Sequence, residues 1–290
     1  MIDLEKINIQ IQKIEENIFE KYNLEIFIAR FDLIHNVVSG NKLFKLFYFL
    51  QDALKTGKKI VTYGGAYSNH LVATAFACKN FGISCKGIVN GEAVPNLSQT
   101  LLKCLEYGME LEFVSRDVYR DIKYGSQNNS VIEIPEGGFH ISGKDGASLM
   151  WHKIKHLKPD YLCLPVGSAT TLAGLVSVAD VKELIAFPAI KNMIDINDRL
   201  TKLNATPLSK LVINNDFHFG GFAKKNDELI NFIKYFNRKH NIPLDFIYTA
   251  KMIYGIYEMI KSGYFLNDSR ILIFHTGGVQ GNEKGLLMSN

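Results

Sequence analysis

The segment Tyr161-Leu-Cys-Leu-Pro-Val-Gly-Ser-Ala-Thr-Thr-Leu-Ala-Gly174 decides the fold class. Its first six residues are apolar and predict a buried strand, and its alanine- and glycine-containing end predicts a helix. The turn between them is rich in glycine, serine and threonine, which is typical of a phosphate-binding turn at a helix N-terminus. It is neither a Walker loop nor a G-x-G-x-x-G fingerprint. Phosphate binding and an ordinary capping turn therefore remain alternatives for this segment.

The same order, a short apolar strand and then a helix, recurs on both sides of this segment. We expect strands at 25–30, 59–63, 84–89, 111–114, 131–134, 161–166, 211–213 and 271–274, and helices at 42–55, 68–81, 96–107, 146–157, from about 170, 224–238 and 251–261. This alternation predicts an α/β fold with parallel sheets covered by helices on both faces. Ligands of such sheets bind beyond the carboxyl ends of the strands.

Composition indicates two lobes and excludes several kinds of partner. The 290 residues are 47% hydrophobic, which is more than one compact core normally uses. The net charge is +4 and the charges are interspersed, so no basic stripe indicates nucleic acid. No apolar stretch approaches the ~20 residues of a membrane helix, and the N-terminus lacks the apolar core of a signal peptide. We therefore expect a cytoplasmic protein without a membrane partner.

The four cysteines carry no clear function. Cys78, Cys85, Cys104 and Cys163 form no Cys-x-x-Cys pair and have no histidine at metal-ligand spacing, so no metal site is expected. Each lies in or beside an apolar run, where cysteine behaves as a small buried hydrophobe. A catalytic thiol is the alternative.

Three further loops carry candidate chemistry. After the strand at 59–63, Gly64 and Gly65 allow a sharp turn, and Ser68 or Asn69 can cap the next helix, whose free N–H groups suit a carboxylate. The alternative is an ordinary capped turn. The second loop, 39–45, places Lys42 at the start of a strongly apolar helix, where an amine loses its proton more readily, as a Schiff-base lysine must.

Solvation at a helix start is the alternative for Lys42. Lys45 lies one turn further on the same helix face and can add positive charge near a phosphate. The third loop, 247–252, begins a helix with Tyr248 and Thr249. Either side chain can face a site or merely cap the helix.

Taken together, these segments resemble the 1-aminocyclopropane-1-carboxylate deaminase and D-cysteine desulfhydrase family of pyridoxal-phosphate enzymes. The resemblance runs from about Phe27 almost to the C-terminus. It rests on Ser39-Gly-Asn-Lys42, Gly64-Gly-x-x-Ser-Asn-His70, Ile134-Pro-Glu-Gly-Gly138, Gly146-Ala-Ser148, Gly167–Gly174, His218-Phe-Gly-Gly221, Tyr248-Thr249 and His275-Thr-Gly-Gly278. Single motifs here are weak, whereas eight in order are specific.

The resemblance implies a two-lobed, three-layer α/β/α fold of the tryptophan-synthase-β type (fold type II). Residues 1–42 and 138–290 would form a large lobe that binds the cofactor, pyridoxal 5'-phosphate, and residues 43–137 a small inserted lobe. The cofactor would lie between the lobes, which would close over the substrate. A small amino acid would be the substrate, and the protein would be a homodimer.

The resemblance also assigns roles to individual residues. Lys42 would bind the cofactor covalently and be catalytic, and Asn69 would bond the ring oxygen of the cofactor. Ser68 and the Asn69–His70 backbone would hold the substrate carboxylate, and Ser68 would also transfer a proton. The phosphate would be held by Lys45, Gly167, Ser168, Ala169, Thr170 and Thr171. Catalytic Tyr248 would line the substrate side of the ring, Phe222 would also bind the substrate, and Thr249 would face the pyridine nitrogen.

Position 249 separates the expected reactions. Deaminase members place a glutamate there, which keeps the ring nitrogen protonated, whereas desulfhydrase members have threonine. Thr249 therefore favours β-elimination from D-cysteine to pyruvate, ammonia and sulfide. Deamination of 1-aminocyclopropane-1-carboxylate, amino-acid racemisation and a non-catalytic cofactor-binding role are alternatives.

Several departures bear on specificity. Phe222 replaces the usual tyrosine and Ala169 a commoner glycine, and the stretch Ser177–Ser209 matches the family poorly.

Overall fold

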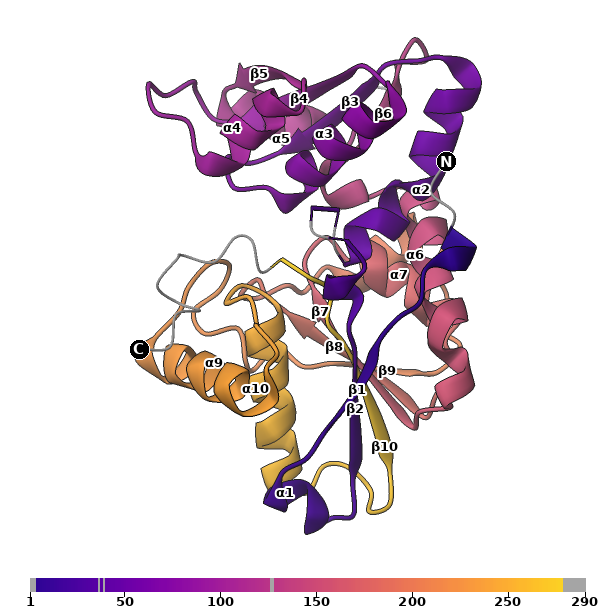
Figure 1. The fold of residues 1–290 in the computed structure, drawn as a ribbon, viewed down its shortest axis with the longest axis vertical. Coiled ribbons are helices and arrows are strands. Elements are labelled where there is room, and N and C mark those ends of the chain that lie inside the picture. Colours follow the sequence, from indigo (N-terminus) through magenta and orange to yellow (C-terminus); the bar gives the residue numbers. More distant parts are fainter. Residues whose placement is uncertain (1–3, 36, 39, 126–127, 279–290) are drawn as a thin grey trace.

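Two β-sheets organise the chain, one above the other in Figure 1. The structure is a computed structural model that describes residues 4–35, 37–38, 40–125 and 128–278. Ser39, the first residue of one predicted motif, lies outside the described residues.

The strands are β1 (Ile11–Ile14), β2 (Glu25–Ala29), β3 (Ile60–Gly64), β4 (Cys85–Asn90), β5 (Glu110–Val114), β6 (Ile132–Ile134), β7 (Tyr161–Val166), β8 (Glu183–Pro188), β9 (Lys210–Ile213) and β10 (Arg270–Phe274). The helices are α1 (Asn17–Glu20), α2 (Asn41–Thr56), α3 (Asn69–Phe81), α4 (Gln99–Glu106), α5 (Arg116–Ile122), α6 (Ile141–Ile154), α7 (Thr170–Val176), α8 (Ile196–Lys202), α9 (Asp227–His240) and α10 (Thr249–Lys261). Short 3-10 turns occupy Leu4–Lys6, Phe31–Leu33, Glu136–Gly138 and Lys155–Leu157.

The larger sheet has the strand order β1-β2-β10-β7-β8-β9. Its strands are parallel except for β1, which runs antiparallel to β2 at the edge and was not predicted. Strand β7 is buried along its whole length, and its side chains alternate between two apolar clusters. Leu162 and Leu164 pack in the cluster that contains residues of α2, α6 and α7, and Tyr161 and Cys163 in the one that contains residues of α9 and α10. Helices thus cover both faces, which confirms the predicted three-layer α/β fold.

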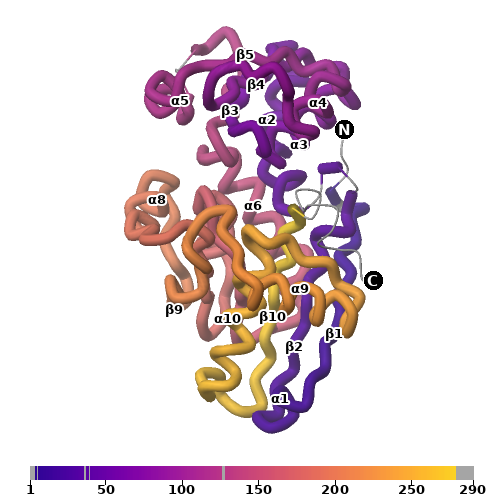
Figure 2. Tube along the Cα trace, turned by 90° about the vertical axis from the view of Figure 1, so that its left-hand side faces the viewer, coloured from indigo at the N-terminus to yellow at the C-terminus, as the bar shows by residue number. Residues whose placement is uncertain are grey.

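The smaller sheet has the order β5-β4-β3-β6, and all of its strand pairs are parallel. Its strands come from one continuous stretch of chain, Ile60 to Ile134. The tube in Figure 2 shows this stretch at one end of the molecule, with α6 leading from it toward the larger sheet. The lobe boundaries at 42/43 and 137/138 remain a prediction.

Helix α6 begins at Ile141, earlier than the predicted Gly146, because its glycines serve close packing and do not break the helix. A Cβ on Gly143 would lie 2.0 Å from the carbonyl oxygen of Gly138, and one on Gly146 would lie 2.1 Å from that of Phe44. Backbone therefore packs directly against backbone where α6 crosses α2.

Elements β8, α5 and α8 were not predicted, and β8 and α8 fall within the stretch that resembles the family poorly.

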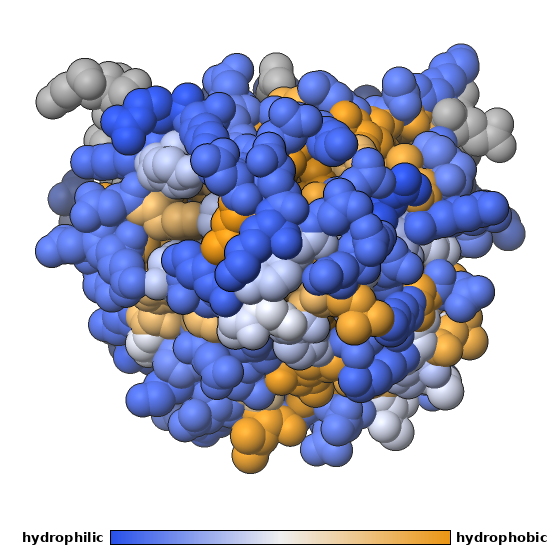
Figure 3. Space-filling view, turned by 90° about the horizontal axis from the view of Figure 1, so that it is seen from below, coloured by the Kyte–Doolittle hydropathy of each residue, from blue (hydrophilic) through white to orange (hydrophobic). Residues whose placement is uncertain are grey.

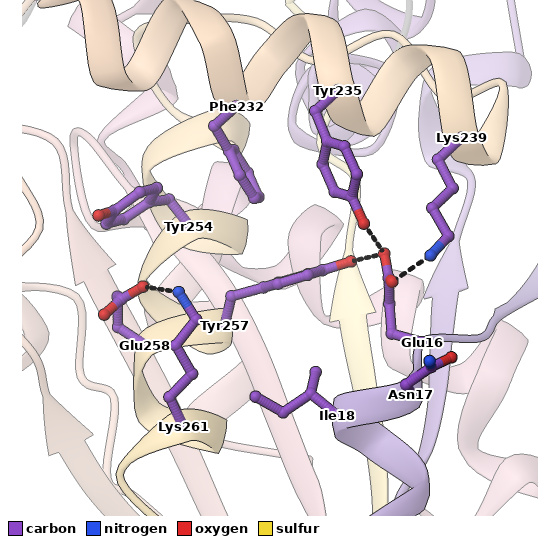
Figure 4. A pocket seen from close by; sticks show the side chains of 10 residues that line it. All are labelled: Glu16, Asn17, Ile18, Phe232, Tyr235, Lys239, Tyr254, Tyr257, Glu258 and Lys261. Carbon is purple, nitrogen blue, oxygen red and sulfur yellow. Dashed lines mark hydrogen bonds and ion pairs between the residues drawn. The ribbon is translucent and has the colours of Figure 1, made fainter.

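Glu16 ties the segment before α1 to helices α9 and α10 (Figure 4). Its carboxylate is 8% exposed and accepts hydrogen bonds from Tyr235 Oη at 2.7 Å, Tyr257 Oη at 3.1 Å and Lys239 Nζ, and it lies 3.0 Å from His240 Nε2. The cluster borders an open cleft of about 430 Å³. Because its donors and acceptors satisfy one another, we interpret the cluster as structural.

Seen from below the view of Figure 1, the surface of the molecule is mostly hydrophilic, with apolar residues in scattered patches (Figure 3). Within the described ranges, no helix is long and apolar enough to cross a membrane.

Candidate active site

The start of α2 lies against the chain that follows β10. Gly40, which precedes the helix, has a φ of +65°, and a Cβ there would lie 1.8 Å from the carbonyl oxygen of Thr276. Only glycine permits this approach. Lys42, in the first turn, donates a long hydrogen bond of 3.4 Å to the same carbonyl. The loop therefore fixes Lys42 at the carboxyl end of the central strands.

Burial makes both lysines of this helix turn easier to deprotonate. It lowers the pKa of Lys42 to about 8, although the charge of Asp245 partly opposes the shift. Burial and then the charge of Lys42 lower the pKa of Lys45 to about 7. A substantial fraction of each amine is therefore neutral near pH 7–8, and a neutral amine is a nucleophile and a base.

The turn after β7 brings hydroxyl donors to the same place as Lys45. Ser168 Oγ and Thr170 Oγ1 each donate to the carbonyl oxygen of Gly137 at 3.2 Å, and Lys45 Nζ donates to it at 2.7 Å. Ala169, with a φ of +68°, forms the left-handed N-cap of α7. Donors from α2 and from a helix start that converge on one point are what an anionic group requires.

Two buried acceptors near this turn have no hydrogen-bond partner in the described part of the chain. One is Asn41 Oδ1, whose own amide group donates to Thr171 Oγ1 at 2.8 Å. The other is His70 Nδ1. Because a buried acceptor without a donor is costly, both atoms indicate that a polar group binds beside them.

The loop after β3 ends in the predicted cap. Ser68 Oγ accepts the Leu71 N–H at 3.3 Å, so Ser68, one of the two predicted candidates, is the N-cap of α3. The His70 ring is buried, with Nε2 3.0 Å from Thr62 Oγ1. Thr62 gives its own proton to the Ile134 carbonyl, so Nε2 carries the ring hydrogen and Nδ1 keeps a lone pair. Burial, and then the charges of Lys45 and Lys42, lower the pKa of His70 to about 3, which keeps the ring neutral. The sequence had indicated only the backbone of His70.

Asp245 belongs to this site and was missed by the sequence analysis. It is 2% exposed and accepts the N–H groups of Ile247, Tyr248 and Thr249 as well as the Thr249 hydroxyl. A Cβ on Gly278 would lie 3.5 Å from Asp245 Cγ and 3.6 Å from Asn69 Nδ2, so the carboxylate and this amide border the same small space. Asp245 lies six residues before the predicted helix start at 251 and so is not at an N-cap position, which is why no capping signal identified it.

Phe222 and Tyr248 line one side of the site with their rings 6.1 Å apart, and Phe222 is half exposed. Tyr248 packs against the turn after β7, because a Cβ on Gly167 would lie 3.0 Å from its ring. Burial raises the pKa of Tyr248, so its hydroxyl stays protonated. Buried Lys251 holds the loop that carries Phe222 by donating to the carbonyls of His218 and Gly221 at 2.8 and 2.7 Å.

Comparison with known families agrees with this arrangement. Residues 14–191, well over half of the chain, match the family described as "Pyridoxal-phosphate dependent enzyme". The chain belongs to this family. The match includes both lysines of α2, the loop after β3 and the turn after β7.

Two curated relatives and one solved structure match about nine tenths of the chain or more. A protein of Thermotoga maritima is 30% identical over 90% of this chain and 91% of its own length, and one of Pyrococcus abyssi is 28% identical over 91% and 87%. Both are named "Putative 1-aminocyclopropane-1-carboxylate deaminase". The crystal structure of an "ACC deaminase homologue" is 25% identical, covers 94% of this chain and 90% of its own, and has a TM-score of 0.79. The predicted family resemblance is therefore confirmed.

Pyridoxal phosphate is the cofactor of this family, and the residues present fit it. An amine that burial makes reactive suits its aldehyde, and the donors around Gly137 suit its phosphate. Among the described residues, no group of three or more histidine, cysteine, aspartate or glutamate side chains is suited to hold a metal ion.

Proposed function

We propose that this protein is a lyase that removes ammonia from a small amino acid, with D-cysteine as the first substrate. The observation that carries the proposal is the position of Lys42. Its amine has a pKa of about 8, and its helix lies against both the hydroxyl-rich turn after β7 and the loop after β10. The protein supplies a reactive amine beside an anion site, which is the minimum for pyridoxal-phosphate chemistry.

The proposal gives each part of the site one task. Lys42 holds the cofactor, and Lys45, Ser168 and Thr170 hold its phosphate together with the backbone from Gly167 to Thr171. Asn69 bonds the ring oxygen, and Thr249 faces the ring nitrogen. Ser68 and the first N–H groups of α3 bind the substrate carboxylate. Tyr248 and Phe222 form the wall on the substrate side.

When bound, the cofactor withdraws electrons from the substrate Cα. Lys42 Nζ, in its neutral form, takes the proton from that carbon. The bond from Cβ to sulfur breaks with both electrons going to sulfur, and in this proposal the Ser68 hydroxyl supplies or relays a proton. In balance, D-cysteine and one water give pyruvate, ammonia and hydrogen sulfide. Threonine at position 249 supports a substrate with a good leaving group such as thiolate.

A second candidate substrate is 1-aminocyclopropane-1-carboxylate, which with one water would give a four-carbon α-keto acid and ammonia. The names of the relatives favour it, and so does the Asp245 carboxylate beside Thr249. Racemisation and a non-catalytic role have no comparable support from the site geometry.

The test is an absorbance spectrum of purified protein with pyridoxal phosphate, followed by D-cysteine or 1-aminocyclopropane-1-carboxylate. We expect a cofactor band that is absent from Lys42→Ala, and then sulfide and pyruvate from D-cysteine. Release of the four-carbon keto acid without sulfide would select the second substrate. A protein that forms no band would contradict the proposal.

A cytoplasmic homodimer remains a prediction, which gel filtration with light scattering and cell fractionation would test.

A further inference from the structure

The Thr249 hydroxyl both donates a hydrogen bond to Asp245 and accepts one from it. Thr249 Oγ1 donates to Asp245 Oδ2 at 2.6 Å and accepts the Asp245 N–H at 2.9 Å. A hydroxyl has one proton and two lone pairs. Thr249 therefore has one lone pair left, and no proton, for any further partner.

Asp245 is held firmly as an acceptor. Its Oδ1 accepts the N–H groups of Ile247 and Tyr248 at 3.0 and 2.7 Å, and its Oδ2 accepts the Thr249 N–H at 2.9 Å. These donors lie at the N-terminus of α10, which itself favours negative charge. The groups around the carboxylate are hydrogen-bond donors, so its oxygens act only as acceptors.

Among the described residues, the titratable groups that face the Asp245 carboxylate are two amines and one phenol. The nearby amines are Lys42 and Lys251, and the charge of Asp245 opposes the effect of burial on both. The phenol of Tyr248 is protonated, and the Asn69 amide is neutral. Asp245 is therefore a buried carboxylate that faces Lys42 and Lys251 and borders the Asn69 amide.

We propose that Asp245 acts through Thr249 to keep the ring nitrogen of the cofactor protonated. This inference rests on the proposed function, which puts Thr249 against that nitrogen. Because the Thr249 hydroxyl donates its hydrogen bond to Asp245, it can only accept a hydrogen bond from the ring nitrogen. It therefore pairs with a protonated ring nitrogen, which carries an N–H, and cannot donate to an unprotonated one. The negative charge behind the hydroxyl then stabilises the positive ring. Asp245 is a positioning residue, because it acts through Thr249.

The proposal changes what Thr249 implies about the substrate. A threonine has no charge of its own to stabilise a positive ring nitrogen, so taken alone Thr249 favours a substrate that releases thiolate. With Asp245 behind it, the ring keeps its full electron-withdrawing power. Substrates without a good leaving group, including a strained carbon ring, then fall within the chemistry of the site.

The test measures the bound cofactor and not turnover. Pyridoxal phosphate labelled with ¹⁵N in the ring is bound to wild-type protein and to Asp245→Asn, Thr249→Val and Thr249→Ser, and the absorbance band first establishes binding. The ¹⁵N chemical shift then reports the protonation of the ring nitrogen. We expect a pyridinium shift in wild type and in Thr249→Ser, which keeps the hydroxyl. We expect a shift to that of unprotonated pyridine in Asp245→Asn and Thr249→Val.

An unprotonated ring in wild type, or a protonated one in Asp245→Asn, would overturn the inference while leaving the proposed cofactor site intact. If Asp245→Asn does not fold, Thr249→Val decides, because it removes the hydroxyl and leaves the carboxylate that accepts the N–H groups of residues 247–249. A protonated ring in Thr249→Val would overturn the inference. Failure of wild-type protein to bind the cofactor would overturn the proposed function and this inference with it.

Discussion

Lys45 Nζ donates a hydrogen bond of 2.7 Å to the carbonyl oxygen of Gly137, shortly after the last strand of the smaller sheet. Two hydroxyls of the turn after β7, in the larger sheet, reach the same oxygen. The donors that we assign to the cofactor phosphate therefore also connect the two sheets. Phosphate binding and the relative position of the sheets are coupled through these donors.

Replacement of Lys45 by methionine tests the phosphate assignment. A charge-assisted hydrogen bond contributes about 1.5–3 kcal/mol, so we expect the affinity for pyridoxal phosphate to fall roughly 10- to 150-fold. Pyridoxal, which has no phosphate, should bind wild type and Lys45→Met equally well. Absorbance titrations measure both affinities. An equal loss for the two compounds would mean that Lys45 does not contact the phosphate.

The lowered pKa of Lys42 predicts how cofactor capture depends on pH. Only the neutral amine attacks an aldehyde, so the initial rate of band formation should rise about tenfold per pH unit below pH 8 and level off above it. Stopped-flow absorbance measures this rate, with an N-acetylated lysine in solution as the reference. A midpoint near 10.5, the ordinary value for lysine, would show that the protein does not perturb Lys42.

Glu16→Gln should destabilise the protein, because the buried carboxylate binds several donors at once. Loss of such a charge costs about 2–4 kcal/mol, measured by urea unfolding. Glu258→Gln is the matched control in the same cleft. Its ion pair with Lys261 is partly exposed, with 33% of the Glu258 side chain and 54% of the Lys261 side chain accessible to solvent, so we expect a change below about 0.5 kcal/mol. Equal effects would contradict a structural role for the Glu16 cluster.

The same carboxylate predicts a loss of stability in acid. Burial raises the pKa of Glu16, but the hydrogen bonds, led by that of Lys239, outweigh it and hold the pKa below its ordinary value of 4.5. Its contribution is therefore complete above about pH 4.5 and falls as pH drops through the lower folded-state value. The stability difference between wild type and Glu16→Gln should narrow over that window in urea unfolding at several pH values. A difference that stays constant down to pH 3 would refute this.

Ala169→Gly should be nearly neutral for stability. Removal of the buried methyl costs about 0.8 kcal/mol, and relief of the left-handed backbone returns about 1–2 kcal/mol, part of which the flexibility of glycine offsets. Ala173→Gly, in the middle of α7, loses its methyl and helix propensity and should cost about 2 kcal/mol. Thermal unfolding compares the two variants. Equal losses would mean that Ala169 is not strained.

The sequence predicted best those features that local patterns determine. Strand β7 coincides with the predicted 161–166, and Ser68 caps α3 as expected, because apolar runs and capping residues act over a few positions. The predicted start of α6 was wrong because Gly146 packs against the backbone of Phe44, which is distant in the sequence. The side-chain role of His70 and the position of Asp245 beside Asn69 depend on packing between segments, which no local pattern encodes.

Strand β10 lies between β2 and β7 in the larger sheet, although the chain between β2 and β10 is about 240 residues long. During synthesis on the ribosome, β2 therefore lacks its parallel neighbour β10 until all strands of the smaller sheet have been synthesised and can pair with one another. The loop after β10 also anchors the helix that carries Lys42. A nascent chain thus has its reactive lysine early but cannot hold it in place until β10 emerges.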